Sequence, residues 1–515
     1  MANSVFITIQ GGQSCEARQG ESVLSALVRA GVIISAPCGG RGICGKCRLT
    51  LLEGSVRLAD TGAEVKAGYS FPACSAAALC DITVSIEQDS FDSFSFVKPL
   101  AVMPTERKVG RAGIGVDIGT TTVQAQLVDL DTGEILETFS ALNNQRSFGA
   151  DVMSRIGVAR NGKLKEMSAA IKNQIEETLR QCIGKWSLPE IEQCTVSANT
   201  TMLHLFCGAD PSAMGEAPYT PVFLEERSFE GRELSLSARN VTLLPGISAF
   251  VGADIVSGLA FLDIMKKKEN ALFIDIGTNG EIAVWRESEK KLLCCSTAAG
   301  PCFEGAEISC GMGAESGAIN RISLKKEKTI PLPTPHSLFP FVPLYYTTLG
   351  NVKARGICGA GLIDAVAVMK RLGAMDETGA LADEFTQTGF PIAEGIVITQ
   401  RDVRQFQLAK SAICSGVKVL CKTAGMEMGD IDTAYIAGGL GFFINLENAA
   451  DVGLLPGELA KKTAVCGNTS LSGAVKSLTD HDFLPRCREI ASRGVIEDLA
   501  LSGDFTSEFA DNMFF

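Results

Sequence analysis

The first 90 residues carry the hydrophobic pattern of a small domain that combines strands with one helix. A run of apolar side chains at residues 5–9 predicts a short strand. Residues 21–30 space their apolar positions as an amphipathic helix does. Apolar and polar side chains alternate along residues 49–51 and 82–86, which is typical of strands with one buried face. The pattern predicts a mostly antiparallel sheet with a single helix.

The pattern changes twice beyond residue 90. Residues 91–111 show no sustained period and contain Pro, Ser and a few basic side chains, which indicates a linker. From residue 112 to the end, strand-like apolar runs alternate with helical segments such as residues 167–183 and 403–424. Such alternation predicts an α/β domain.

Two segments of this α/β part resemble each other. GVDIGTTTV at residues 115–123 and FIDIGTNGE at residues 273–281 each pair an apolar strand with Asp-Ile-Gly-Thr and a polar turn. Their separation is too long for a solenoid repeat and suits two related halves of one domain. We expect lobe I at about 112–265 plus a C-terminal segment, and lobe II at about 270–480.

The amino-acid composition indicates the cellular compartment of the protein and excludes some classes of partner. The 515 residues include 18 Cys but only 3 His, and the formal net charge is −12. The start of the chain lacks the basic and apolar regions of a secretory leader, and no run reaches the roughly 18 apolar residues of a membrane span. We therefore expect a cytoplasmic protein with reduced thiols, with no membrane and no nucleic acid as partner.

Four cysteines stand at a spacing that binds metal. Cys38, Cys44, Cys47 and Cys74 follow the pattern C-x5-C-x2-C-x26-C, and glycines fill the first gap. A [2Fe–2S] cluster takes three thiolates from one tight loop and a fourth from a later segment. The plant-type loop is one residue shorter than this one. A zinc site and inert thiols are the alternatives, although zinc sites usually have two C-x2-C pairs.

The first Asp-Gly-Thr segment has the form of a phosphate-binding hairpin. Gly119 permits a sharp turn, so that backbone N–H groups and the hydroxyls of Thr120, Thr121 and Thr122 can reach phosphate oxygens. Asp117 at the end of the strand is placed to hold a hydrated Mg²⁺. A single turn of this kind is weak evidence, because such turns are common.

The later part of the chain contains a second hairpin of this kind, a glycine-rich segment and a candidate catalytic carboxylate. Asp275, Gly277, Thr278 and Asn279 form the second hairpin, which could clamp a triphosphate from the other side. Three glycines that would let the chain pack flat against an adenosine lie in IAGGLGFF at 436–443: Gly438, Gly439 and Gly441. Shortly before the second hairpin, Asp254 is a candidate for orienting or deprotonating the attacking water, with a helix N-cap as the alternative role.

The three elements together resemble the phosphate and adenosine motifs of the actin-like ATPase superfamily, which includes sugar kinases and heat-shock chaperones. No Walker-type G-x-x-x-x-G-K-[ST] motif occurs, and GAGLID at 359–364 lacks the full Rossmann fingerprint. The cysteine loop resembles ferredoxin-like β-grasp domains. The resemblance implies an α+β β-grasp domain followed by an α/β, two-lobed, ribonuclease-H-like ATPase domain.

The combination of these two modules resembles the reductive activators of corrinoid-dependent proteins, also called RACE-type activators. The resemblance covers nearly the whole chain, and seven segments carry it: residues 143–156, 198–206, 273–282, 298–312, 356–364, 403–413 and 467–474. Some members have a small extra domain between linker and ATPase domain, and the chain is expected to lack it.

This family resemblance implies a function. The cluster would receive an electron from a low-potential cellular donor and pass it to Co(II) of a corrinoid protein of a methyltransferase system. ATP with Mg²⁺ would supply driving force to regenerate the methyl-accepting Co(I) state. A homodimer and an anaerobic setting are also implied.

Other functions remain open from the residues alone. A small-molecule kinase of the same superfamily with a redox-sensing cluster is the main alternative. An electron carrier with a degenerate ATPase half, and an ATPase chaperone that delivers clusters, are two further hypotheses. The intact Asp117, Thr120, Asp275 and Thr278 argue against a degenerate ATPase half.

Overall fold

The computed structural model describes most of the chain. The described residues are 5–10, 14–18, 20–30, 32, 34, 36, 40, 42, 47–86, 109–324, 336–339, 342–499 and 502–515. Most of the predicted linker at 91–111 lies outside them. The chain divides into two compact units, one built from Met1–Leu244 and Ser477–Asp480, the other from Pro245–Lys476 and His481–Phe515.

The N-terminal part has the predicted sheet with one helix. The main sheet has the strand order β2-β1-β8-β3-β6, and a smaller sheet has the order β5-β4-β7. Only the β1–β8 pair is parallel among the pairings of these described strands. The elements are β1 (Val5–Ile9), β2 (Ser14–Ala17), α1 (Val23–Arg29), β3 (Arg48–Glu53), β4 (Ser55–Leu58), β5 (Glu64–Lys66), β6 (Ser70–Pro72), β7 (Ala76–Ala78) and β8 (Ile82–Ile86).

Helix α1 and the main sheet share one apolar core. The side chain of Ser22 caps α1 by accepting a hydrogen bond from the backbone N–H of Ser25. Leu27 of α1 packs with Leu49, Phe71 and Val84 from the strands, all of them fully buried. The alternating pattern in the sequence therefore marked the buried face of the sheet.

The second part of the first unit is a six-stranded sheet with the order β11-β10-β9-β12-β14-β13. Strands β9, β12 and β14 run parallel, whereas β10, β11 and β13 run antiparallel to their neighbours. The elements are β9 (Ala112–Ile118), β10 (Thr122–Asp129), β11 (Ile135–Leu142), α2 (Val152–Val158), α3 (Leu164–Trp186), β12 (Ile191–Ala198), α4 (Thr200–Cys207), β13 (Arg227–Glu230) and β14 (Ala238–Leu243).

The main sheet of the second unit repeats this topology. Its order is β25-β24-β15-β16-β17-β26, so that β17-β16-β15-β24-β25 matches β11-β10-β9-β12-β14 in order and direction. The strands are β15 (Ala271–Ile276), β16 (Gly280–Arg286), β17 (Lys291–Thr297), β24 (Thr433–Ala437), β25 (Thr463–Gly467) and β26 (Gly494–Ile496). The internal resemblance in the sequence therefore corresponds to two sheets of the same topology, as the predicted two-lobed fold requires.

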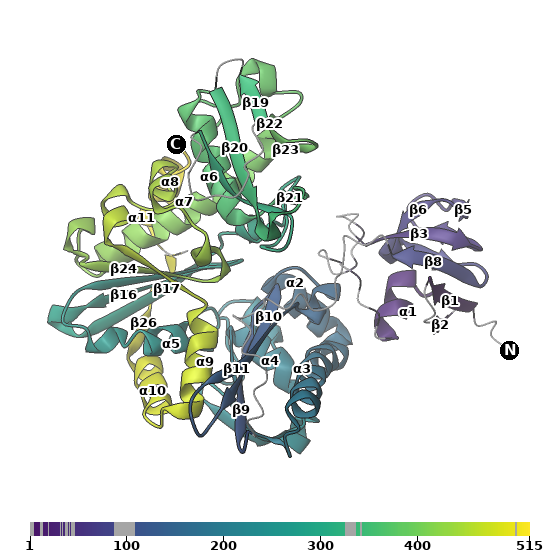
Figure 1. Ribbon diagram of the computed structural model, residues 1–515, viewed down its shortest axis with the longest axis horizontal. Coiled ribbons are helices and arrows are strands. Elements are labelled where there is room, and N and C mark those ends of the chain that lie inside the picture. Colours follow the sequence, from purple (N-terminus) through teal and green to yellow (C-terminus); the bar gives the residue numbers. More distant parts are fainter. Residues whose placement is uncertain are drawn as a thin grey trace. The chain divides into compact units, whose positions relative to one another are not determined.

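Helices cover both faces of this second sheet. Helices α7 and α11 lie on one face, and α5 and α10 lie on the other (Figure 1). The helices are α5 (Ala253–Phe261), α6 (Gly359–Arg371), α7 (Gln400–Thr423), α8 (Leu446–Asp451), α9 (Thr469–Thr479), α10 (Phe483–Arg493) and α11 (Gly503–Asp511). The remaining strands are β18 (Ala318–Ser323), β19 (His336–Phe339), β20 (Val342–Thr348), β21 (Gly356–Ile357), β22 (Phe390–Ala393) and β23 (Ile396–Ile398).

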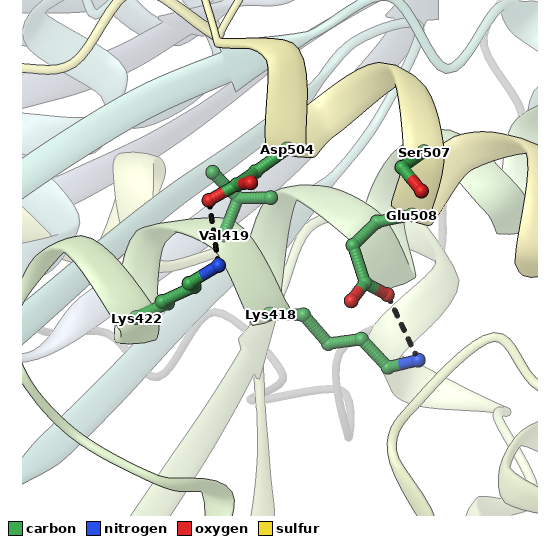
Figure 2. A pocket seen from close by; sticks show the side chains of 6 residues that line it. All are labelled: Lys418, Val419, Lys422, Asp504, Ser507 and Glu508. Atoms are coloured by element: carbon green, nitrogen blue, oxygen red, sulfur yellow. Dashed lines mark hydrogen bonds and ion pairs between the residues drawn. The ribbon is translucent and has the colours of Figure 1, made fainter.

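The C-terminal helix α11 is fastened to α7 by charged side chains. Lys422 Nζ lies 2.7 Å from Asp504 Oδ2, and Lys418 Nζ lies 3.3 Å from Glu508 Oε2. Both pairs line a small pocket between the two helices (Figure 2). These lysines and carboxylates therefore satisfy one another, and the pocket is a feature of helix docking. No helix among the described residues is long and apolar enough to cross a membrane.

Candidate functional site

The first predicted phosphate hairpin joins β9 to β10. Asp117 lies near the end of β9, and the backbone N–H of Gly119 donates a 2.9 Å hydrogen bond to the carbonyl of Thr122. A Cβ atom at Gly119 would lie 2.7 Å from that carbonyl oxygen. Only glycine fits this turn, as the sequence predicted.

Side chains from outside the hairpin hold its backbone carbonyls. Asn143 Nδ2 donates to the carbonyl of Gly119 at 2.8 Å, and Arg155 Nη2 donates to the carbonyl of Thr120 at 2.5 Å. A trans peptide points its C=O and the following N–H in opposite directions. The N–H groups of Thr120 and Thr121 therefore face away from Asn143 and Arg155. Successive N–H groups turned to one side form the kind of concavity that binds anions.

The hydroxyl of Thr120 is also oriented. Asn199 Nδ2 donates to Thr120 Oγ1 at 3.2 Å, so the hydroxyl proton remains available for another acceptor such as a phosphate oxygen. Asn199 is itself fixed, because its side-chain oxygen caps α4 by accepting from the N–H of Met202. Thr120 is buried, so its hydrogen bond with Asn199 is shielded from solvent.

Sequence reasoning missed these three supporting residues. Asn143, Arg155 and Asn199 lie in segments that carried the family resemblance, but no role was predicted for them. The available signal was weak: Asn199 stands directly before a helical run, as N-cap residues do. Arg155 gave no signal, because its acceptor is 35 residues away in the sequence.

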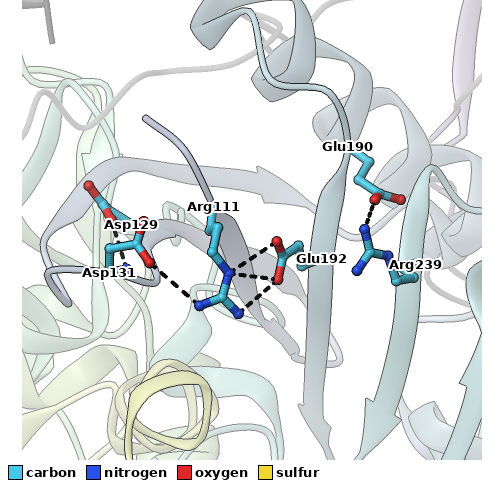
Figure 3. A network of polar contacts seen from close by, with 6 residues as sticks. All are labelled: Arg111, Asp129, Asp131, Glu190, Glu192 and Arg239. Atoms are coloured by element: carbon cyan, nitrogen blue, oxygen red, sulfur yellow. Dashed lines mark hydrogen bonds and ion pairs between the residues drawn. The ribbon is translucent and has the colours of Figure 1, made fainter. Parts of the chain in front are cut away.

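The strand that leads into this hairpin is anchored at its other end by charges. Arg111 next to the start of β9 binds Glu192 with two nitrogens and also contacts Asp131 (Figure 3). A neighbouring pair joins Arg239 to Glu190. Exposed ion pairs of this type stabilise a fold only weakly, because water and salt screen the two charges. The Arg111–Glu192 pair connects the residue before β9 to β12, and the Arg239–Glu190 pair connects β14 to the residue before β12.

The second predicted hairpin joins β15 to β16 in the other unit. Asp275 lies on β15, and the N–H of Gly277 donates to the carbonyl of Asn279 at 3.0 Å. Thr278 Oγ1 lies 2.5 Å from Glu304 Oε2, to which it donates. Glu304 therefore lines this hairpin, and it accepts the hydroxyl proton that a phosphate would otherwise receive from Thr278.

Three carboxyl groups gather at the second hairpin. Burial raises the pKa of Glu281 on β16 well above its usual range, and the nearby carboxylates of Asp254 and Asp275 raise it further. Ser296 donates a hydrogen bond to Glu281 at 3.2 Å. The raised pKa favours the protonated form of Glu281, which limits the negative charge beside Asp254 and Asp275. The sequence gave no reason to single out Glu281.

Asp254 lies in the first turn of α5 and not at its N-cap, which is Gly252. Its carboxylate accepts the N–H of Ile255 at 2.9 Å. The alternative that Asp254 serves as the N-cap residue is therefore wrong. Its electrostatic effect on Glu281 places it near the second hairpin, where the proposed water-orienting role requires it.

The glycine-rich segment follows β24 and meets the same hairpin. Strand β24 pairs in parallel with β15, opposite Asp275. Gly438 has φ of +89°, and a Cβ there would lie 2.7 Å from Asp275 Oδ1. Gly439 and Gly441 belong to the short helical turn Gly439–Phe442 that follows. Within this unit, the structure thus brings Asp254, the second hairpin and the start of the glycine segment together.

The structure describes two of the four cysteines that were predicted to bind the cluster. Cys38 and Cys44 lie outside the described residues, whereas Cys47 and Cys74 are adjacent, with the Cys74 N–H donating to Cys47 Sγ at 3.4 Å. A Cβ at Gly40 would lie 3.9 Å from Cys74 Cβ. The loop backbone therefore passes close to Cys74, as a site that holds a cluster between a glycine loop and a distant thiolate requires.

The other cysteines do not resemble metal ligands. Twelve lie in the ATPase part, and nine of them are buried. Cys207, Cys310 and Cys466 are only partly buried. Burial raises the pKa of Cys194 to about 12, and similar shifts keep the other buried thiols protonated.

His204 is a core residue of the first unit. It is fully buried, and its ring stacks on Phe223 with centroids 4.3 Å apart. The N–H of Val222 donates to Nε2 at 3.0 Å, so the ring proton is on Nδ1 and is donated to the carbonyl of Thr200 at 2.7 Å. Both ring nitrogens are satisfied within the fold.

Three protein-family descriptions match consecutive parts of the chain. A 2Fe-2S iron-sulfur cluster binding domain matches residues 7–79. The RACo middle region matches residues 112–267, and the C-terminal domain of RACo, the ASKHA domain, matches residues 269–515. The chain thus has a cluster-binding domain and an ATPase domain, whose cofactors are a [2Fe–2S] cluster and ATP with Mg²⁺.

Individual proteins also match over most of the chain. The corrinoid activation enzyme RamQ of Eubacterium limosum is 32% identical over 434 residues, which cover 78% of this chain and 70% of that protein. A [Co(II) methylated amine-specific corrinoid protein] reductase of Methanosarcina barkeri is 27% identical over 424 residues, covering 78% and 76%.

A solved structure extends these matches over nearly the whole chain. It is that of a reductive activator for corrinoid, iron–sulfur protein, with 27% identity and a TM-score of 0.70, and it covers 99% of this chain and 98% of the other. The sequence predicted that a small domain found in some members after the linker is missing. The comparisons do not bear this out: the RACo middle region matches residues 112–267, directly after the linker, and the match covers 98% of the solved activator's chain.

Proposed function

The chain belongs to the family of reductive activators of corrinoid-dependent proteins, and from that premise we propose an ATP-dependent one-electron reduction. The protein takes one electron from a low-potential cellular donor and delivers it to Co(II) of a corrinoid protein in a methyltransferase system. Co(II) gains the electron and becomes the methyl-accepting Co(I), while the protein returns to its oxidised state. The observation that carries this proposal is the joining of a cysteine–glycine loop and two phosphate hairpins on one chain.

The cluster ligands in this proposal are Cys38, Cys44, Cys47 and Cys74. A [2Fe–2S] cluster supplies one-electron transfer at a potential near roughly −400 mV in its plant-type form. The contact between the Cys74 N–H and Cys47 Sγ supports the proposal, because N–H groups directed at thiolates stabilise their negative charge.

Each hairpin would bind phosphate groups of the nucleotide. Asp117 holds hydrated Mg²⁺, and the hairpins from Gly119 to Thr122 and from Gly277 to Asn279 bind the phosphates. The glycine segment that begins at Gly438 packs against the adenosine. The inward-turned carbonyls of Gly119 and Thr120 support this assignment, since they leave the adjacent N–H groups facing outward.

Asp254 orients or deprotonates the water that attacks the terminal phosphate. Its position in the first turn of α5, next to Asp275 and the protonated Glu281, supports this role. The raised pKa of Glu281 limits the build-up of negative charge at this site, where a carboxylate is needed to bind a cation or to activate water.

ATP is needed because the cobalt couple lies at a very low potential, so electron transfer from a plant-type cluster runs uphill. Nucleotide binding and hydrolysis can shift the equilibrium only if ATP binds two conformations of the protein differently. We infer that the nucleotide domain gates docking of the corrinoid protein. We also propose a cytoplasmic location, a homodimer and the domain division at residues 1–90, 91–111 and 112–515.

The direct test follows Co(II) and Co(I) optically under anaerobic conditions, with reduced protein and a panel of corrinoid proteins. We expect Co(I) to form with ATP and not without it. Asp117→Asn should abolish the ATP-dependent part, whereas Asp131→Asn, an exposed aspartate of the same lobe, should retain it. Equal reduction with and without ATP would contradict the coupling, and phosphorylation of a small molecule would favour the kinase alternative.

A further inference from the structure

The hydroxyl of Ser75 contacts a sulfur atom at the cysteine site. Ser75 Oγ lies 3.5 Å from Sγ of Cys74, a hydrogen-bonding distance for sulfur, and both residues are partly buried. We propose that Ser75 donates this hydrogen bond to the ligand thiolate and thereby raises the reduction potential of the cluster. This inference rests on the proposed ligation by Cys74 and is independent of the ATP-coupled step.

The direction of the hydrogen bond follows from the chemistry of the ligand. A cysteine that binds iron is a thiolate, and a thiolate has no proton to donate. The hydroxyl of Ser75 is therefore the donor. Ser75 itself is held in place, because its carbonyl accepts the N–H of Ala59 at 2.8 Å.

The cysteine loop leaves room for this hydroxyl at one glycine. Gly42 has φ of +77°, and a Cβ there would lie 3.0 Å from Ser75 Oγ. A side chain at this position would press on the hydroxyl that contacts Cys74. The glycine in the loop and the serine after the fourth cysteine therefore act as a pair, although they are far apart in the sequence.

The effect on potential follows from charge. Reduction adds one negative charge to the cluster and its thiolates, and a hydrogen-bond donor stabilises the more negative state. A second donor is the backbone N–H of Cys74, which points to Cys47 Sγ, and a side-chain substitution at Ser75 leaves this contact in place. Removing the Ser75 hydroxyl should thus lower the potential without removing the second donor.

The reduction potential of the cluster affects both electron transfers, the one from the cellular donor to the cluster and the one from the cluster to cobalt. A higher potential makes the cluster easier to reduce by the donor, and it weakens the driving force toward Co(II). Without the hydroxyl, the donor should reduce the cluster less completely, and the reduced cluster should be a stronger reductant. Ser75 would therefore set the balance between these two transfers.

The test is an anaerobic redox titration of the full chain, followed by visible absorbance and by electron paramagnetic resonance of the reduced cluster. We expect Ser75→Ala to shift the midpoint to a lower potential. At a fixed poise the ratio of reduced to oxidised cluster falls, and a tenfold fall corresponds to 59 mV for one electron. Ser75→Thr keeps a hydroxyl and should restore the midpoint.

The matched control is Ser55→Ala. Ser55 Oγ also contacts a cysteine sulfur, that of Cys80 at 3.8 Å, and Cys80 is not a proposed ligand. This variant should keep the wild-type midpoint. If Ser75→Ala loses its cluster, Ser75→Cys, with a weaker donor, should give an intermediate midpoint. Unchanged midpoints in cluster-containing Ser75 variants would overturn the proposal, whereas a wild-type protein without a cluster would overturn the cluster assignment itself.

Discussion

Arg155 Nη2 donates a hydrogen bond to the backbone carbonyl of Thr120 at 2.5 Å, across 35 residues of sequence. The guanidinium is fully buried and also donates to the carbonyl of Gly149 through Nε at 3.0 Å. It thereby connects the first phosphate hairpin to the loop before α2. A planar group with several donors can hold two carbonyls at once, which a lysine ammonium does less well.

We predict that Arg155→Met weakens ATP binding. The variant fills the space but leaves the Thr120 carbonyl without this donor, so the hairpin no longer holds its N–H groups outward. A hydrogen bond from a charged donor contributes about 1.5–3 kcal/mol, which corresponds to a loss of roughly ten- to a hundredfold in affinity. The measurement is the KM for ATP in hydrolysis, together with direct nucleotide titration.

The control for this variant is Arg160→Met. Arg160 is exposed, pairs with Glu216 at 2.5 Å and donates to the carbonyl of Ser212 at 2.9 Å. Such a pair contributes only about 0–1 kcal/mol. Arg160→Met should keep wild-type affinity, and Arg155→Lys should lie between the two. Wild-type ATP affinity in Arg155→Met would refute the supporting role.

We predict that Gly438→Ala disrupts the second hairpin. The position combines positive φ with a close approach to Asp275 Oδ1 and to the carbonyl of Ile276, each 2.7 Å from an added Cβ. Backbone strain alone costs about 1–3 kcal/mol. The midpoint temperature of unfolding should fall, and ATP hydrolysis should fall more than tenfold because Asp275 is displaced.

Gly457→Ala is the control for this change. Nothing lies within 4 Å of an added Cβ there, and Gly457 also belongs to the second unit. Hydrolysis and thermal stability should stay near wild type. Normal hydrolysis in Gly438→Ala would show that the glycine is not required where the chain meets Asp275.

We predict that His204 makes the protein less stable in acid. Burial lowers the pKa of His204 below its ordinary value of 6.5, because the charged ring loses its hydration; the hydrogen bond to the Thr200 carbonyl acts in the opposite direction and is the smaller effect. The unfolded chain therefore takes up the proton first as the pH falls through about 6.5. The free energy of unfolding is highest above this pH and declines below it, by at most about 1.4 kcal/mol per pH unit from this residue.

Denaturant titrations between pH 8 and pH 5 measure this dependence. His204→Asn should lower stability at all pH values, since the buried ring is lost, but its decline below about pH 6.5 should be shallower than that of the wild type. An identical pH dependence in the two proteins would exclude His204 as the cause.

We predict that Cys74→Ala loses the cluster. The thiolate of Cys74 is the proposed fourth ligand, and without it one iron lacks its tetrahedral set. Visible absorbance and iron content of the anaerobically purified protein should both drop to background. Cys80→Ala changes the next cysteine along the chain, which is exposed, and should keep both signals. Loss in both variants would argue against the assignment of Cys74.

Features that depend on neighbouring residues could be read from the sequence. The Asp-Ile-Gly-Thr runs at Asp117 and Asp275 encode tight local turns. The turns at Gly119 and Gly277 form as predicted, because a turn is closed by hydrogen bonds within a few residues. The alternation of strands and helices likewise predicted both sheets of the ATPase domain.

The sequence by itself determined the two modules, their order and the local form of each loop. Only the tertiary structure decided what supports them: Arg155 beneath Thr120, Glu281 beside Asp275, and the Gly42 and Ser75 pair at Cys74. Burial turned Glu281 into a neutral acid and Arg155 into a backbone anchor. These roles arise from contacts between distant segments, and a residue's spacing along the chain does not record which segments fold against it.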